Sequence, residues 1–292
     1  VSDGDLMEGV ACEAASLAIA ERFLAARYNR PGHEVIDHIT YAIVSDGDLM
    51  EGVACEAASL AGHLALGKLI YLYDDNGITI DGTTDIAFTE DVEARFASYG
   101  WHVQKVDGMN PTAVNRAISE ARLETERPSL ILAKTTIGFG SPNKAGTSKV
   151  HGSPLGPDEL KLTKAALGLP TDTDFYVPEE ALSVYRHAVA DGERLEKEWE
   201  ARMESYARAY PAEAAELRAA ISGELGEAWK DALPSFGEKM ATRKAGKLVL
   251  EAIAPHVPNL LLGSADLGES TFTVLHGAPD QQKGSPEGRN VN

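Results

Sequence analysis

Two short apolar runs in this chain are each followed directly by an acidic turn. Residues 40–44 (TYAIV) have the composition of a buried strand, and residues 45–47 (SDG) end it. Residues 49–66 then place apolar side chains at three- and four-residue steps, which predicts a helix. The second run, residues 68–73 (KLIYLY), ends at residues 74–77 (DDNG). Because open parallel sheets bind ligands at the carboxyl ends of their strands, the two turns predict one binding site.

The oxygen atoms of these turns suit a magnesium ion and a phosphate. Asp46 offers a carboxylate and Asn76 an amide oxygen 30 positions later (76 − 46), while Ile78 offers a backbone carbonyl. Mg²⁺ commonly takes a few protein oxygens and completes its shell with phosphate and water. Gly47 lets the backbone approach a phosphate closely. Either turn alone is typical of an ordinary turn or helix cap; the pair at this spacing favours a site.

The same stretch carries an extended motif. It matches GDG-x-x-x-EG…SLAG…LGKLI…YDDNGI-x-IDG except that Ser45 stands at the first glycine. This pattern resembles that of the transketolase family of thiamine-diphosphate enzymes. The resemblance implies thiamine diphosphate and Mg²⁺, with Ca²⁺ or Mn²⁺ as substitutes for the metal. It implies metal binding by Asp46, Asn76 and Ile78, and cofactor binding by Gly47, Asn76, Ile78 and Ile80.

The overall charge narrows the class of partner. Lys and Arg number 27 against 45 Asp and Glu, a formal charge of 27 − 45 = −18. This balance disfavours nucleic acid and anionic membranes as partners.

No apolar run reaches 18 residues, and the first residues show no signal peptide, so we expect a cytoplasmic protein without a membrane span. The two cysteines form no disulfide framework or metal cluster.

A perfect repeat opens the chain, because residues 1–18 are identical to residues 44–61. A structural repeat diverges and recurs at a fixed period, so the pair is interpreted as a sequence-level duplication. Only one copy can face the Asn76 turn. We therefore expect residues 1–18 to lie outside the native fold, although the copy is also compatible with extending a helix over residues 19–28.

Helices and strands alternate through residues 19–157. Further helices are predicted at residues 90–99, with Thr89 as cap, and at residues 111–126; further strands are predicted at 101–106 and 129–136. This alternation predicts an α/β fold with a doubly wound parallel sheet. The resemblance makes residues 19–157 the thiamine-diphosphate-binding domain.

Residues 137–157 are rich in glycine and proline and contain His151. A loop this long is usually functional or disordered, and a histidine within one is commonly a surface residue. In transketolases the matching segment folds over the thiamine site. The resemblance implies that His151 contacts cofactor and substrate and acts in catalysis. Ser148 stands where the family often carries another histidine, which bears on the sugar contacts.

Residues 158–234 are helical, acidic and rich in alanine, and predict a connector. An apolar stripe runs through residues 193–210 until Pro211 interrupts it. We interpret this stripe as packing surface within a link between two domains.

Residues 235–292 predict the first elements of a second α/β domain, with a helix at 242–253 and a short strand at 260–263. They resemble the opening of the transketolase pyrimidine-binding domain. The resemblance implies sugar-phosphate binding by Arg243 and Ser270 and cofactor binding by Asp266. Residues 276–292 are expected to form a loop whose return strand is absent.

The resemblance implies a transketolase fragment. The family moves a two-carbon ketol unit from a ketose phosphate to an aldose phosphate, and the parent enzyme is expected to be a homodimer. We expect this chain alone to lack turnover. An alternative is a non-catalytic half that binds thiamine diphosphate and Mg²⁺ and needs a second polypeptide; a truncated, partly unfolded remnant is a third.

Overall fold

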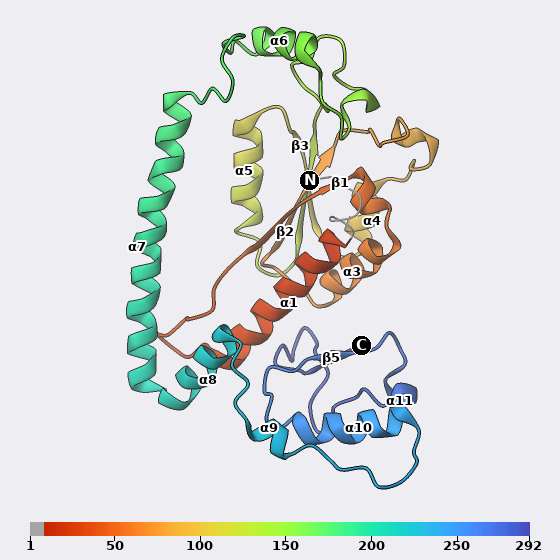
Figure 1. The fold of residues 1–292 in the computed structure, drawn as a ribbon, viewed down its shortest axis with the longest axis vertical. Helices are drawn as coiled ribbons and strands as arrows, with labels where there is room; N and C mark the ends of the chain where they lie inside the picture. Colours follow the sequence, from red (N-terminus) through yellow and green to blue (C-terminus); the bar gives the residue numbers. More distant parts are fainter. Residues whose placement is uncertain (1–8) are drawn as a thin grey trace. The chain divides into compact units, whose positions relative to one another are not determined.

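A computed structural model describes residues 9–292 of the chain (Figure 1). The chain divides into two compact units: one holds the chain up to Ile19 with His38–Gly192, the other Ala20–Asp37 with Glu193–Asn292. The domain boundaries expected after residues 157 and 234 stay a prediction. In the second unit, the end of helix α7 (Glu179–Ala209) packs against residues 24–36.

A four-stranded parallel sheet forms the centre of the first unit, as the sequence predicts. Its strands are β1 (Thr40–Ser45), β2 (Leu69–Asp75), β3 (His102–Asp107) and β4 (Ser129–Lys134), in the order β1-β2-β4-β3. β1 and β2 are neighbours, and Ser45 pairs with Asp74 in their register. The ends of both strands, and so the two polar turns, therefore lie side by side at one edge of the sheet.

Helices cover both faces of this sheet (Figure 1). α1 (Val10–Tyr28), α3 (Gly52–His63) and α4 (Val92–Ser98) pack on one face, and α5 (Pro111–Ala121) packs on the other. The remaining helices of this unit are α2 (Asp46–Met50) and α6 (Pro157–Ala166), with 3-10 turns at Thr84–Ile86 and Ser148–Val150. The doubly wound arrangement is the predicted one.

The predicted helix over residues 49–66 is interrupted. α2 begins at Asp46 and ends at Met50, and Glu51 adopts an extended conformation before α3 starts. The cap of α4 also differs from the expectation. Asp91, and not Thr89, accepts a 3.0 Å hydrogen bond from the backbone of Ala94, because the helix starts at Val92.

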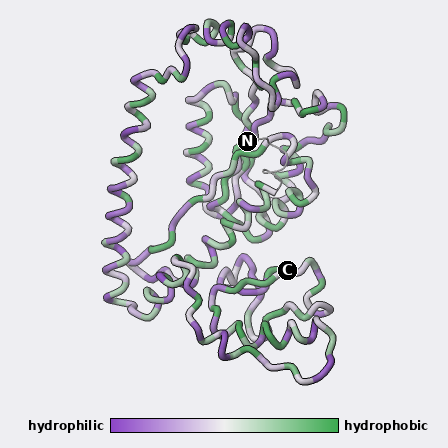
Figure 2. Tube along the Cα trace, viewed as in Figure 1, coloured by the Kyte–Doolittle hydropathy of each residue, from purple (hydrophilic) through white to green (hydrophobic). Residues whose placement is uncertain are grey.

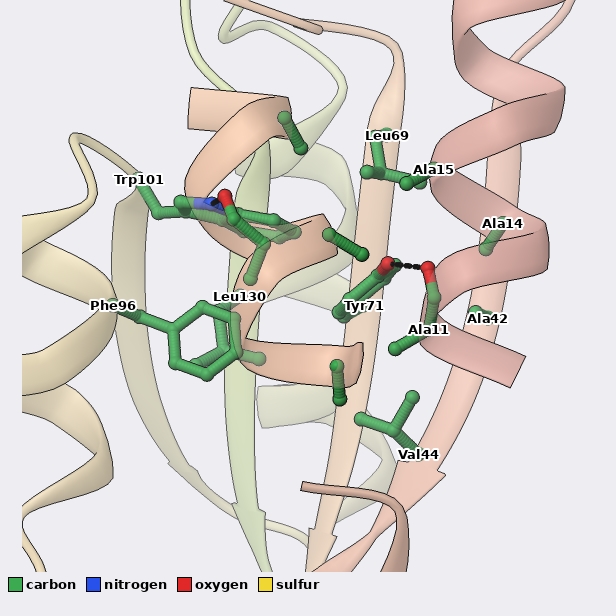
Figure 3. Packing of buried hydrophobic residues seen from close by; sticks show 14 of the residues in the cluster. Ala11, Ala14, Ala15, Ala42, Val44, Leu69, Tyr71, Phe96, Trp101 and Leu130 are labelled. Carbon is green, nitrogen blue, oxygen red and sulfur yellow. Dashed lines mark hydrogen bonds between the residues drawn. The ribbon is translucent and has the colours of Figure 1, made fainter. Parts of the chain in front are cut away.

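The core between the sheet and α1 contains part of the repeated segment (Figure 3). The hydroxyl of Tyr71 on β2 donates to the carbonyl of Ala11. The buried alanines occupy matching places in the two copies: Ala11, Ala14, Ala15 and Ala18 in α1, and Ala54, Ala57, Ala58 and Ala61 in α3. The expectation that the first copy lies outside the fold is therefore wrong for residues 10–18, since their small side chains let α1 pack closely on the sheet. Residues 1–8 lie outside the described part of the chain.

Gly62 allows the end of α3 to approach the segment before β3. A Cβ atom at Gly62 would lie 1.8 Å from the carbonyl oxygen of Tyr99, so no larger residue fits there without movement. On the same side of α3, the indole of Trp101 donates a 2.8 Å hydrogen bond to the carbonyl of Ala58. These contacts fix α3 against the sheet.

The second unit is built around α8 (Pro211–Ser222) and the end of α7. Buried Tyr28, Met203, Tyr206 and Leu217 form its main core. Figure 2 shows that α7 is mostly hydrophilic along its length, which agrees with the burial of only a few of its side chains. No helix within residues 9–292 is both long and apolar enough to cross a bilayer.

A small parallel pair of strands completes the second unit. β5 (Leu262–Gly263) pairs with β6 (Asn290–Val291). The helices in this part of the chain are α9 (Ala228–Asp231), α10 (Thr242–Ile253) and α11 (Gly268–Thr271). The expectation of an unpaired loop to the end of the chain is wrong. The buried amide of Asn290 hydrogen-bonds the backbone of Leu275 and Ala278, at 2.8 and 3.0 Å, and this holds β6 in place.

Candidate functional site

A cavity of about 680 Å³ lies at the carboxyl ends of β1 and β2. Its wall includes five of the residues that the sequence assigns to cofactor binding: Gly47, Asn76, Ile78, Ile80 and His151. These residues come from the turn after β1, the turn after β2 and the long loop after β4. The structure therefore brings together segments that are up to about a hundred residues apart (151 − 47 = 104).

Asp46, the first residue of α2, is not among the residues that line the cavity and is only 2% exposed. One carboxylate oxygen accepts a hydrogen bond from the hydroxyl of Tyr73, and the other accepts a 3.0 Å hydrogen bond from the backbone N–H of Gly77. Burial raises the pKa of the Asp46 carboxyl, and these two hydrogen bonds act in the opposite direction. The carboxylate thus links the turn after β1 to the turn after β2.

The amide of Asn76 is held in one orientation. Its NH₂ group donates a 2.9 Å hydrogen bond to Asp74, and its oxygen accepts one of 2.9 Å from the backbone N–H of Ile78. Asp74 in turn accepts a hydrogen bond from the hydroxyl of Thr135 at the end of β4. The sequence did not single out Asp74 or Thr135, because their contact depends on the pairing of β2 with β4.

This donor set fits a hard cation. Asp46, Asn76 and Ile78 supply a carboxylate, an amide and a backbone oxygen, the oxygen ligands that Mg²⁺ takes in proteins. Within residues 9–292, no group of three or more His, Cys, Asp and Glu side chains is placed to hold a metal ion. A metal at these turns would therefore rely on the amide and backbone oxygens together with Asp46.

Gly47 forms an open part of the cavity wall. A Cβ atom at this position would have one neighbour within 4 Å, the hydroxyl oxygen of Ser45 at 3.9 Å. A side chain here would extend into the cavity instead of into the protein. The turn itself is fixed by Asp48, which accepts hydrogen bonds of 2.7 and 2.9 Å from the backbone and hydroxyl of Ser45.

His151 lies half-buried in the cavity wall, just after the 3-10 turn Ser148–Val150. The loop that carries it is tied to α6 by Glu159. This buried carboxylate accepts hydrogen bonds from the hydroxyl of Ser141 and from the backbone and side chain of Asn143, the latter two at 2.9 and 2.8 Å. These bonds lower the pKa of Glu159. Sequence reasoning missed Glu159, since nothing in the residues around it marks the contact.

The remaining predicted site residues lie in the second unit. One guanidinium nitrogen of Arg243 donates a 3.3 Å hydrogen bond to the backbone carbonyl of Ser270, so these two residues are in contact. The guanidinium also lies over the ring of Phe272, 5.6 Å from its centroid. Asp266 is exposed in the turn before α11 and has a left-handed backbone, with φ of 56°.

The fold and cavity define a class of protein: a doubly wound α/β domain with a cavity at the carboxyl ends of its parallel strands, where such sheets bind ligands. Residues 1–226 match the family described as transketolase, thiamine diphosphate binding domain, and residues 238–292 match transketolase, pyrimidine binding domain. The chain belongs to the transketolase family.

Individual relatives agree with this assignment. The chain is 50% identical to a transketolase of Geobacillus stearothermophilus over an alignment of 292 positions, which covers 99% of this chain and 44% of the relative. Among solved structures, it matches transketolase from Leishmania mexicana with a TM-score of 0.93 at 41% identity, over 99% of this chain and 43% of that one. A Pichia stipitis transketolase in complex with sedoheptulose 7-phosphate matches with a TM-score of 0.91 at 42% identity, over 96% and 43% of the two chains. The chain thus spans less than half the length of these relatives.

Proposed function

We propose that this chain holds the diphosphate end of thiamine diphosphate through Mg²⁺, as part of a longer transketolase. The carrying observation is the cavity that gathers Gly47, Asn76, Ile78, Ile80 and His151 at the carboxyl ends of β1 and β2. The proposed reaction of the whole enzyme is transfer of a two-carbon ketol unit from a ketose phosphate to an aldose phosphate. The relatives named transketolase and the Pichia stipitis complex with a sugar phosphate support this proposal.

Each predicted site residue of the first unit has a proposed role. Asp46, Asn76 and the carbonyl of Ile78 would bind the metal, with Ca²⁺ or Mn²⁺ as substitutes. Gly47 would admit the diphosphate, and the apolar side chain of Ile80 would line the cofactor and exclude water. His151 would contact cofactor and substrate and act in catalysis. When bound, the cofactor supplies the chemistry for breaking and forming the carbon–carbon bond.

In the second unit, Arg243 and Ser270 are proposed to bind the phosphate of the sugar. A guanidinium beside a serine is suited to this, because it donates charged hydrogen bonds to phosphate oxygens. Asp266 is proposed to contact the cofactor. For the parent enzyme we propose a cytoplasmic homodimer of the pentose phosphate pathway, without nucleic-acid or membrane partners; relatives described as chloroplastic show that location varies in the family.

Calorimetric titration of the chain with thiamine diphosphate, with and without Mg²⁺, tests the proposal. We expect binding that requires Mg²⁺ and is lost in Asn76→Ala. The matched control is Asn115→Ala, an exposed asparagine on α5 away from the cavity wall. Binding that is independent of Mg²⁺, or that is unchanged in Asn76→Ala, would contradict the proposed site.

A further inference from the structure

We infer that Tyr73 is a positioning residue for the metal-binding carboxylate of Asp46. This inference rests on the proposed function, because it takes Asp46 as a ligand of the metal. It assigns a role to the tyrosine of the YDDNGI motif, to which the resemblance gives none. Tyr73 lies on β2, three residues before Asn76, and its side chain is only 3% exposed.

The geometry restrains the carboxylate from two sides. The hydroxyl of Tyr73 donates to Oδ1 of Asp46, while the backbone N–H of Gly77 donates to Oδ2 at 3.0 Å. An ionised carboxylate has about four acceptor positions, so each oxygen keeps one for a cation. Gly77 lies between the two other proposed ligands, Asn76 and Ile78. The two hydrogen bonds therefore fix Asp46 relative to the rest of the ligand set before a metal arrives.

Tyr71 provides a natural comparison on the same strand. It lies two residues before Tyr73, so both side chains point to one face of the sheet, and both are buried. The hydroxyl of Tyr71 donates to the backbone carbonyl of Ala11, a contact between strand and helix. The hydroxyl of Tyr73 donates to a side chain of the site. Removing either hydroxyl takes a donor away from a buried acceptor. Only the loss of the Tyr73 hydroxyl removes one of the two hydrogen bonds that orient the carboxylate of Asp46.

The test compares Tyr73→Phe with Tyr71→Phe in the complete 292-residue chain. Mg²⁺ is titrated by calorimetry in the presence of thiamine diphosphate, and thermal unfolding is recorded for each variant. Loss of a group that orients a metal ligand typically weakens metal affinity by about 10- to 100-fold. We expect such a loss in Tyr73→Phe alone, with both variants unfolding at lower temperature than the wild type. Equal Mg²⁺ affinity in wild type and Tyr73→Phe would overturn the inference while leaving the proposed function intact.

Failure of the wild type itself to bind Mg²⁺ would instead contradict the proposed function, and the inference with it. A second measurement avoids deleting the hydroxyl. With 3-fluorotyrosine placed at position 73 alone, the ¹⁹F signal should shift when Mg²⁺ and thiamine diphosphate are added; at position 71 it should not. An unchanged signal at position 73 in a chain that binds Mg²⁺ would also overturn the inference.

Discussion

The backbone N–H of Gly77 donates a 3.0 Å hydrogen bond to the carboxylate of Asp46, although the two residues are 31 positions apart in the chain. This bond joins the turn after β1 to the turn after β2. The two acidic turns are therefore held together, and a change in either one affects the other.

Replacing Asp46 tests the role of these joined turns directly. We expect Asp46→Ala to abolish Mg²⁺-dependent binding of thiamine diphosphate, measured by calorimetry. The same change at Asp3, which has the same neighbours in the repeated sequence, should leave binding unaltered, because only the second copy is followed by the Asn76 turn. Equal losses in both variants would show that the wrong copy has been assigned to the site.

Gly47→Val should separate ligand binding from folding. The added side chain would enter the cavity, where only the hydroxyl of Ser45 lies within 4 Å of its Cβ. We expect weaker binding of thiamine diphosphate with little change in the unfolding temperature. The matched control is Gly52→Val at the start of α3. A Cβ there meets no atom of residues 9–292 within 4 Å, and Gly52 lies outside the cavity wall. Similar affinities of the two variants would contradict this role of Gly47.

The loop that carries His151 should loosen in acid. Hydrogen bonds from Ser141 and Asn143 hold the pKa of Glu159 below its ordinary value of 4.5. A carboxyl with a lowered pKa in the folded state stabilises that state above its unfolded-state pKa, and this stabilisation is lost as the pH falls through the folded-state pKa. The protection of residues 141–155 against hydrogen exchange, taken relative to the intrinsic rate at each pH, should therefore fall below about pH 4.5.

Glu159→Gln should show fast exchange of the same residues already at neutral pH, and its exchange should lack the acid-dependent step. The neighbouring exposed residue gives the control, Asp158→Asn, which should behave as the wild type. A loop that exchanges equally in wild type and Glu159→Gln would refute this account.

Gly62→Ala should destabilise the first unit. Its Cβ would lie 1.8 Å from the carbonyl oxygen of Tyr99, a backbone atom that cannot move without displacing the chain before β3. Overpacking of this kind typically costs about 1–3 kcal/mol in the free energy of unfolding. Gly192→Ala in α7, where a Cβ meets no atom of residues 9–292 within 4 Å, should instead be slightly stabilising. Urea unfolding of both variants measures the difference.

The sequence predicted the parts of the structure that depend on local pattern. The apolar runs gave β1 and β2, and their parallel pairing places Ser45 beside Asp74 without further information. The hydrogen bonds of Tyr73, Asp74 and Glu159 were not predicted, because each joins residues from different elements. The packing of residues 10–18 was also missed. Their identity with residues 53–61 was interpreted as a sequence-level duplication outside the fold, with extension of the following helix as the alternative. The structure has that extension, and the same alanines pack on the sheet in both places.

The repeat means that either copy could in principle occupy the position of α1 or that of α3. In a swapped arrangement the first copy would lie where α3 lies. The residues that follow the copies differ: Gly62 follows the second, and Ile19 stands at the matching place after the first (19 + 43 = 62). An isoleucine at the position of Gly62 would collide with the backbone of Tyr99, where even a Cβ does not fit. One residue outside the repeat thus excludes the swapped arrangement by steric clash. The two identical segments are then left with a single favourable arrangement.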